Sequence, residues 1–250
     1  VTLPAYCIDR TEVTVRAYQE CVQAGRCEPA PTSVSWPGIA ASDSRLGDPT
    51  CNGSRADRLE HPVNCVDWNA AARYCDFRGA RLPTEAEWEL AARGADGRTY
   101  PLDPEDIALG IVLDASRGTY PWGEQAPDAA RLNAGGRELV AWYRARHRDY
   151  TGMYRGDDRW PNTAPVGSFP AGASPYGVLD MAGNVSEWVA DAYSPYDAGS
   201  TVSPDQTGPR VTRGGGWSVN LQDGVRAAYR NADVPASRGG GLGFRCARAG

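Results

Sequence analysis

YGVLDMAGNVSEWV, residues 176–189, is the stretch from which the rest of this sequence can be interpreted. It holds a turn at Tyr176-Gly177, a short apolar run, a second turn at Gly183-Asn184, and an acid beside a tryptophan. Asn184 and Glu187 lie three positions apart across an irregular turn, so an amide oxygen, a carboxylate and main-chain carbonyls can converge. Ca²⁺ binds such oxygen ligands. The spacing indicates calcium, unless Asn184 only caps a turn and Glu187 is solvated.

The composition is that of a loop-rich globular protein. At 250 residues the chain could form one large domain or two small ones. Its 29 glycines, 19 prolines and 8 tryptophans favour a fold with few helices. The net charge of −5 is mixed along the chain without a basic stripe, so nucleic acid is not expected as a partner. No apolar run approaches the roughly 18 residues of a membrane helix, so this region is not expected to insert into a membrane.

Seven cysteines and two histidines limit the metal and redox chemistry. No CxxC pair or HExxH motif is present, which disfavours zinc. Scattered cysteines in a loop-rich chain favour disulfides and a periplasmic or extracellular location, the alternative being reduced, buried cysteines in a cytosolic protein. No lysine is present, which excludes Schiff-base chemistry on a lysine. No secretory signal is visible in the sequence, because Val1 opens directly onto a polar-apolar pattern, so we expect a mature form or an excised region of a larger protein.

Apolar spacing predicts helices at residues 15–24, 67–78 and 84–93. Asp67 is the expected N-cap of the second helix, and Thr84 with Glu87 forms a capping box for the third. Short strands are predicted within residues 5–15 and around 210–218, 225–230 and 242–247. The glycine runs at 214–216 and 239–241 neither match GxGxxG nor open a helix, so no nucleotide-binding loop is expected.

Three segments are expected to be loops. Residues 29–60 are rich in proline, serine, glycine and aspartate. RTYP at 98–101 is echoed by GTYPWG at 118–123, which indicates an insertion at 101–120 with a short helix at Glu105–Val112. A further excursion at 135–157 contains Trp142-Tyr143, and its aromatics favour an ordered loop.

Eight blocks resemble, in order, those of the formylglycine-generating enzyme (sulfatase-modifying factor) family: IDRTEVTV, HPVNCVDWNAAARYC, RLPTEAEWELAARG, YPWG, TAPVGSFP, YGVLDMAGNVSEW, RGGGW and GLGFRCA. They cover nearly the whole chain. The resemblance implies an α+β fold low in regular secondary structure, formed as a single domain over residues 1–250. It also implies a C-type-lectin-like core that is often calcium-bound.

The resemblance implies two sets of calcium ligands in this chain. The first corresponds to Asn184, the carbonyl of Val185, and Glu187. The second corresponds to Asn133, Ala134, Asp158 and Trp160. Excursion 135–157 lengthens the loop between the two halves of the second set, and Asp158 could instead be a solvated loop residue.

The resemblance also implies one disulfide, Cys75–Cys246. In the chain-entropy model a bridge closing a loop of about 170 residues contributes up to roughly 5 kcal/mol. Cys21 and Cys27 lie six positions apart across a predicted helix end, close enough to bridge. Cys51–Cys65 is the remaining pairing that we expect, which leaves Cys7 as the odd thiol.

One departure from the family pattern bears on function. In the family's oxidases, two cysteines five positions apart follow the RGGSW-like strand, bind copper and oxidise a substrate cysteine to formylglycine. Counting from Arg213–Trp217, those positions are Val219 and Gly224 here. A cuprous ion needs thiolates, so no copper and no such oxidase activity is expected.

Three functions remain open. The first is a domain that binds a protein or small-molecule ligand through the segment from Trp217 to Arg238, with Trp217, Asn220, Gln222, Asp223, Arg226, Tyr229, Arg230 and Asn231 on its face. The structural alternative is that these arginines pair with nearby acids and Trp217 lies in the core. The second is an enzyme of non-copper chemistry, with Asp223, or Glu187 without a metal, as the acid or base. The third is an accessory or sensory domain of a larger protein.

Overall fold

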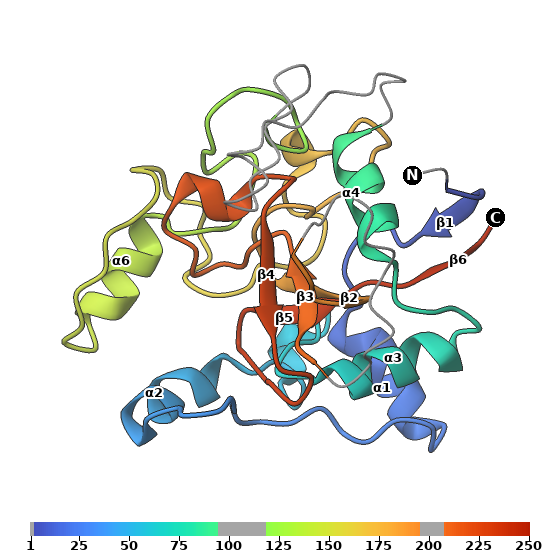
Figure 1. Ribbon diagram of the computed structural model, residues 1–250. Helices are drawn as coiled ribbons and strands as arrows, with labels where there is room; N and C mark the ends of the chain where they lie inside the picture. Colours follow the sequence, from blue (N-terminus) through green and yellow to red (C-terminus); the bar gives the residue numbers. More distant parts are fainter. Residues whose placement is uncertain (1–2, 95–118, 196–207) are drawn as a thin grey trace.

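The computed structural model describes residues 3–94, 119–195 and 208–250. Within these ranges the strands form a four-stranded sheet, in the order β4-β3-β2-β5, and a two-stranded sheet, β1-β6 (Figure 1). The strands are β1 (Tyr6–Ile8), β2 (Ser186–Ala192), β3 (Arg210–Arg213), β4 (Arg230–Asp233), β5 (Leu242–Phe244) and β6 (Ala247–Ala249). The α-helices are α1 (Val15–Gln23), α2 (Ala41–Gly47), α3 (Trp68–Phe77), α4 (Glu85–Arg93) and α6 (Arg137–Arg144). Short 3-10 turns are η1 (Asp48–Thr50), η2 (Ala56–Arg58), η3 (Pro170–Gly172) and η4 (Gln222–Val225).

Strand β2 is central and contains the SEW part of the opening stretch. It runs antiparallel to β3 and parallel to β5, with Glu187 opposite Arg213 on one side and Gly243 on the other. Strands β1 and β6 pair antiparallel and hold the two ends of the chain together, as Figure 1 shows. This mixture of short helices and small sheets confirms the α+β fold class with little regular structure.

Three helices begin where the sequence predicts. Thr14 accepts a hydrogen bond from Ala17 N at the start of α1, and Asp67 accepts one from Ala70 N at the start of α3. Both halves of the Thr84–Glu87 capping box are formed at α4. These side chains satisfy backbone N–H groups that have no partner within the helix, which is why each helix starts there.

The core lies between the helices and the central sheet. Tyr18 of α1 stacks on Tyr74 of α3 at 5.6 Å between ring centroids, and Tyr74 meets Phe244 of β5 edge-on at 5.5 Å. Trp188 of β2 is fully buried in the same cluster. On the α4 side, Trp88 packs in a second cluster with residues of β2 and β3.

Three disulfides connect the segments: Cys21–Cys27, Cys51–Cys65 and Cys75–Cys246. Cys7 is the free cysteine and is exposed. These pairings agree with the sequence-based expectation, and three disulfides indicate an oxidising compartment. No helix in the described ranges is long and apolar enough to span a membrane.

The loop predictions were partly wrong. Segment 29–60 contains the seven-residue helix α2 and two 3-10 turns, and excursion 135–157 contains the eight-residue helix α6. The strand expected at 225–230 is instead Arg230–Asp233, preceded by η4. Helix α2 is short and has no buried residue, so it leaves little apolar periodicity to detect. The insertion at 101–120 and its helix at Glu105–Val112 lie outside the described residues, apart from Thr119 and Tyr120.

Candidate functional site

The turn after β3 holds the two positions at which copper-binding cysteines would be expected, Val219 and Gly224. Gly214 and Gly215 have φ angles of 89° and 67°, a left-handed conformation that glycine adopts without strain. A Cβ atom on Gly224 would lie 2.7 Å from Cγ1 of Val219, so the two positions face each other. Neither residue is a thiol. The residues present therefore do not fit a thiolate copper centre.

Glu187, a predicted calcium ligand of the first set, is the partner of Arg245. Both side chains are completely buried. Nη2 and Nε of Arg245 donate to Oε1 and Oε2 of Glu187 at 2.6 and 2.7 Å. The indole N–H of Trp88 donates to Oε2 as well, at 2.8 Å. The carboxylate of Glu187 is thus a hydrogen-bonded counter-ion inside the core.

Asn184 is likewise engaged by the protein. It has a φ of 59°, and its Oδ1 accepts hydrogen bonds from Ala164 N at 2.8 Å and from Asn133 Nδ2 at 3.1 Å. Its Nδ2 donates to Glu12 Oε1 at 3.0 Å. With Glu187 paired to an arginine, the set Asn184, Val185 and Glu187 fits a cation poorly. Calcium binding by the GNVSEW segment stays a prediction, which these hydrogen bonds and the ion pair do not favour.

The second predicted set does come together, in spite of the excursion between its halves. Tyr154 hydroxyl donates to Asp158 Oδ2 at 2.6 Å and accepts from Ala134 N at 3.1 Å, which joins the two segments. Trp160 N donates to Asp158 Oδ1 at 2.9 Å. Burial raises the pKa of Asp158 to about 7. Asn133 Oδ1 is buried without a hydrogen-bond partner.

An amide oxygen without a partner and a desolvated carboxylate are both ligands that a hard cation such as Ca²⁺ accepts. Among the described residues no three His, Cys, Asp or Glu side chains gather as metal ligands. A cation held by Asn133, Ala134, Asp158 and Trp160 would therefore depend on amide and carbonyl oxygens beside the one carboxylate.

The predicted binding face, Trp217–Arg238, is only partly a surface. Five of its proposed contact residues are exposed: Asn220, Gln222, Asp223, Tyr229 and Asn231. Arg226 lies 3.8 Å from the Asp223 carboxylate and is largely covered. Arg230 is not available, because its guanidinium binds both carboxylate oxygens of Glu85 at 2.6 and 2.7 Å. The alternative that the arginines of this segment pair with nearby acids is therefore correct for Arg230.

Trp217 is also largely buried, but its ring lines a pocket of about 450 Å³. The pocket lies where four separate segments meet: the 34–50 segment with α2, the end of α6, the turn after β3, and the glycines at 239–241. Its aromatic wall consists of Trp36, Trp142, Tyr143 and Trp217. In Figure 1, α2 and α6 lie on the same side of the central sheet.

Contacts among these rings hold the wall in place. The rings of Trp142 and Trp217 meet edge-on at 6.3 Å, and Tyr143 stacks on Tyr150 at 4.7 Å. Tyr150 hydroxyl donates to the carbonyl of Ser218 at 2.7 Å, which ties the segment after α6 to the turn after β3. The pocket wall is thus pre-formed by packing.

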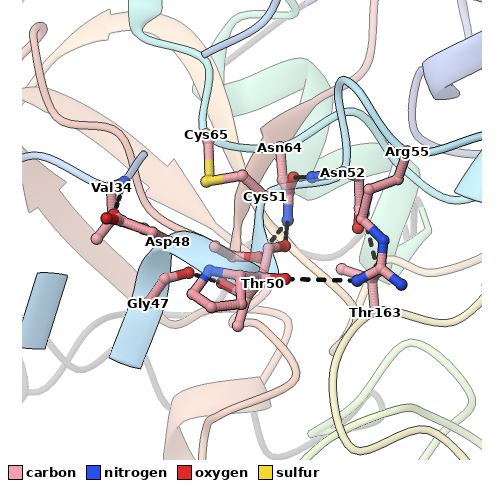
Figure 2. Close-up of a disulfide and its surroundings, with 12 residues drawn as sticks. Val34, Gly47, Asp48, Thr50, Cys51, Asn52, Arg55, Asn64, Cys65 and Thr163 are labelled. Carbon is pink, nitrogen blue, oxygen red and sulfur yellow. Dashed lines mark hydrogen bonds between the residues drawn. A yellow bond between two sulfur atoms is a disulfide. The ribbon is translucent and has the colours of Figure 1, made fainter. Parts of the chain in front are cut away.

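The glycines at 239–241, which line the pocket, are held in place by hydrogen bonds to their backbone. Asn64 Nδ2 donates to the carbonyls of Gly240 and Thr50 at 2.6 and 2.9 Å, and the Trp217 indole donates to Gly240 O at 2.8 Å. Figure 2 shows Asn64 and Thr50 next to the Cys51–Cys65 disulfide. The disulfide therefore anchors the segment that lines one side of the pocket.

Sequence reasoning identified only Trp217 of this pocket as a binding residue. It missed Trp36, Trp142 and Tyr143, together with the polar residues Asp43, Arg148 and Asp149. The sequence feature that could have indicated the pocket was the aromatic pair Trp142-Tyr143 inside a polar excursion. It predicted an ordered loop but did not indicate that these rings pack near Trp217.

Comparisons with known proteins agree with this architecture. The whole chain, residues 1–250, matches the family described as sulfatase-modifying factor enzyme 1-like domain. It is 37% identical over 209 residues to a formylglycine-generating enzyme of Thermomonospora curvata, covering 78% of this chain and 57% of the relative. It is 34% identical over 201 residues to the inactive C-alpha-formylglycine-generating enzyme 2 of Mus musculus, covering 76% and 50%.

A solved structure, PvdO from Pseudomonas aeruginosa, has a TM-score of 0.59 at 25% identity and covers 98% of this chain and 80% of that one. The chain spans about half the length of the two sequence relatives. The match over all residues and the identities above 30% show the relationship directly. This chain belongs to the sulfatase-modifying factor family, the family of the formylglycine-generating enzymes.

Proposed function

We propose that this domain binds a ligand in the pocket beside Trp217 and does not oxidise cysteine with copper. One observation carries the proposal: in the turn after β3, Val219 faces Gly224 where a cuprous ion would need two thiolates. Trp217 and Ser218, which directly precede Val219 in the same turn, line a pocket of about 450 Å³. A family member named as inactive, at 34% identity, supports the first half of the proposal.

The pocket has the features of a small-molecule site. Its volume lies in the roughly 300–1,000 Å³ range of ligand pockets, and aromatic side chains with a few polar groups line it. The two residues that could act as acid or base if the protein were an enzyme lie outside this pocket. Asp223 has a side chain that is 84% exposed, and Glu187 is buried against Arg245. Neither lines this pocket, which favours binding over acid–base catalysis there.

Two assays test the proposal together. The first incubates the protein with a cysteine-containing sulfatase peptide, Cu(I) and oxygen, and measures peptide mass; we expect no change, and aldehyde formation would overturn the non-oxidase half. The second screens small neutral and aromatic compounds by NMR, following the indole N–H signals of Trp142 and Trp217. We expect some compounds to shift both signals, and shifts that persist in Trp142→Ala would place binding elsewhere.

We propose further that Asn133, Ala134, Asp158 and Trp160 hold a calcium ion, as the family resemblance implies. The partnerless Oδ1 of Asn133 and the desolvation of Asp158 support this. Calcium should raise the thermal unfolding midpoint relative to EDTA, because it binds only the folded state. Asp158→Asn should abolish that rise, whereas Asp157→Asn, its exposed neighbour paired with Arg137, should retain it. An equal calcium effect in both variants would place any calcium site elsewhere.

The three disulfides also support a periplasmic or extracellular location for this protein. Three disulfides fit the periplasm or the cell exterior, and alkylation of the protein in intact cells followed by mass spectrometry tests this. We expect one reactive thiol, Cys7, with the other six cysteines oxidised.

A further inference from the structure

The chemistry of the pocket wall narrows the class of ligand. Three tryptophans and a tyrosine offer flat apolar surface, and tryptophan and tyrosine pack well against groups that are apolar on one face and polar at the edge. A ligand with a C–H face and polar groups around its rim would use such a wall. An entirely apolar ligand would leave the polar lining groups without partners.

The charges on the pocket lining oppose an anionic ligand. Asp43 of α2 and Arg148, which follows α6, pair at 2.9 Å and cancel. The guanidinium of Arg146 lies 3.9 Å from the ring centroid of Trp142, so a face that could attract a ligand cation already has one. The carboxylate of Asp149, on the lining, repels anions. The lining therefore disfavours an anionic ligand.

Hydrogen-bonding groups remain for such a ligand. Within the described ranges no hydrogen bond or ion pair engages the Asp149 carboxylate or the Ser218 hydroxyl, and both residues line the pocket. A carboxylate can only accept hydrogen bonds, whereas a hydroxyl can donate and accept. The ligand should therefore carry several O–H or N–H donors.

We infer that this pocket binds a carbohydrate without acidic groups. A pyranose ring of this kind has an apolar C–H face to lie against the indoles, hydroxyl groups at its edge to donate to Asp149 and to pair with Ser218, and no negative charge. This inference rests on the proposed function, because it names the ligand class of the same pocket.

The test compares one sugar ring in three charge states. Glucose, glucosamine and glucuronate are titrated to tens of millimolar at neutral pH, alongside the methyl glycosides of galactose, mannose and N-acetylglucosamine, with indole as an apolar probe. The readout is the indole N–H signals of Trp142 and Trp217. At least one sugar without an acidic group should shift both signals, and glucuronate should bind about tenfold more weakly or not at all, because the Asp149 carboxylate repels it.

Variants assign the contacts. Trp142→Ala should abolish sugar binding. Asp149→Ala should weaken it about tenfold, the effect of losing a hydrogen bond to a charged acceptor. Tyr176→Ala, an exposed tyrosine outside the pocket, is the matched control and should bind sugar normally.

The outcomes separate a failure of the carbohydrate inference from a failure of the proposed binding function. Equal binding of glucuronate and glucose, or indole binding without sugar binding, overturns the carbohydrate inference but leaves the pocket as a binding site. If neither sugars nor indole shift the two tryptophan signals, the proposed function fails as well.

Discussion

The replacement Glu187→Gln tests whether the buried Glu187–Arg245 pair stabilises the central sheet. Both side chains are fully buried, and two hydrogen bonds of 2.6 and 2.7 Å join them. Arg245 also donates to the carbonyls of Asp9 and Leu179 at 3.0 and 2.9 Å. Glutamine keeps the shape but removes the charge, which leaves a buried guanidinium without its counter-ion. Removing one partner of a buried pair costs about 3–5 kcal/mol, and we expect a loss of that size.

The assay is urea unfolding, followed by tryptophan fluorescence and by circular dichroism, in the presence of EDTA. EDTA matters because a role of Glu187 as a calcium ligand would make its loss costly only when calcium is bound. The control is Glu60→Gln, which breaks an ion pair with Arg16 whose side chains are 61% and 57% exposed. That exposed pair should contribute about 0–1 kcal/mol.

The double variant Glu187→Gln/Arg245→Met completes the cycle. Arg245→Met should cost less in the Glu187→Gln background than in the wild type, because the first change has already left the arginine uncompensated. A loss below about 1 kcal/mol for Glu187→Gln in EDTA, with an unchanged denaturant slope, would refute this account of the core.

Three further predictions follow from the same contacts. Burial raises the pKa of Glu12 well above its usual range, so its stabilising contribution is lost as pH rises through the folded-state value. The thermal midpoint should therefore fall more in the wild type than in Glu12→Gln as pH rises from about 4.3, the ordinary pKa of a glutamate; equal slopes would contradict this. Replacing Cys75 and Cys246 by alanine opens a 171-residue loop and should cost roughly 5 kcal/mol in chemical unfolding, against roughly 2 for the disulfide that spans six residues. Reduced Val219→Cys/Gly224→Cys should compete with a chelating dye for Cu(I), whereas either single variant should not; failure of the double variant would show that the two positions do not face each other as described.

Much of the framework was readable from the sequence because its causes are local or lie in recognisable blocks. The Thr84–Glu87 capping box marks the start of α4 through side chains that bond the adjacent backbone. Cys21 and Cys27 are joined across one helix end. The Cys75–Cys246 bridge and the overall α+β fold followed from the family blocks, which run in order along nearly the whole chain.

Only the tertiary structure decided which partners the functional side chains have. The sequence places Glu187 beside Asn184, yet its partner is Arg245, 58 positions away. Arg230 has the composition of an interface residue, but Glu85, 145 positions away, occupies its guanidinium. Neither pairing leaves a periodic or spacing signal, because each is set by how the helices pack on the sheet.

The pocket is decided in the same way. Trp36, Trp142 and Trp217 come from three distant segments, and each alone reads as an ordinary aromatic residue. The sequence by itself determined that Val219 and Gly224 supply no thiolate, so these two positions cannot form a thiolate copper site. Folding decided that aromatic side chains gather next to that turn, because long-range packing brings together residues whose separation along the chain carries no information about their distance in space.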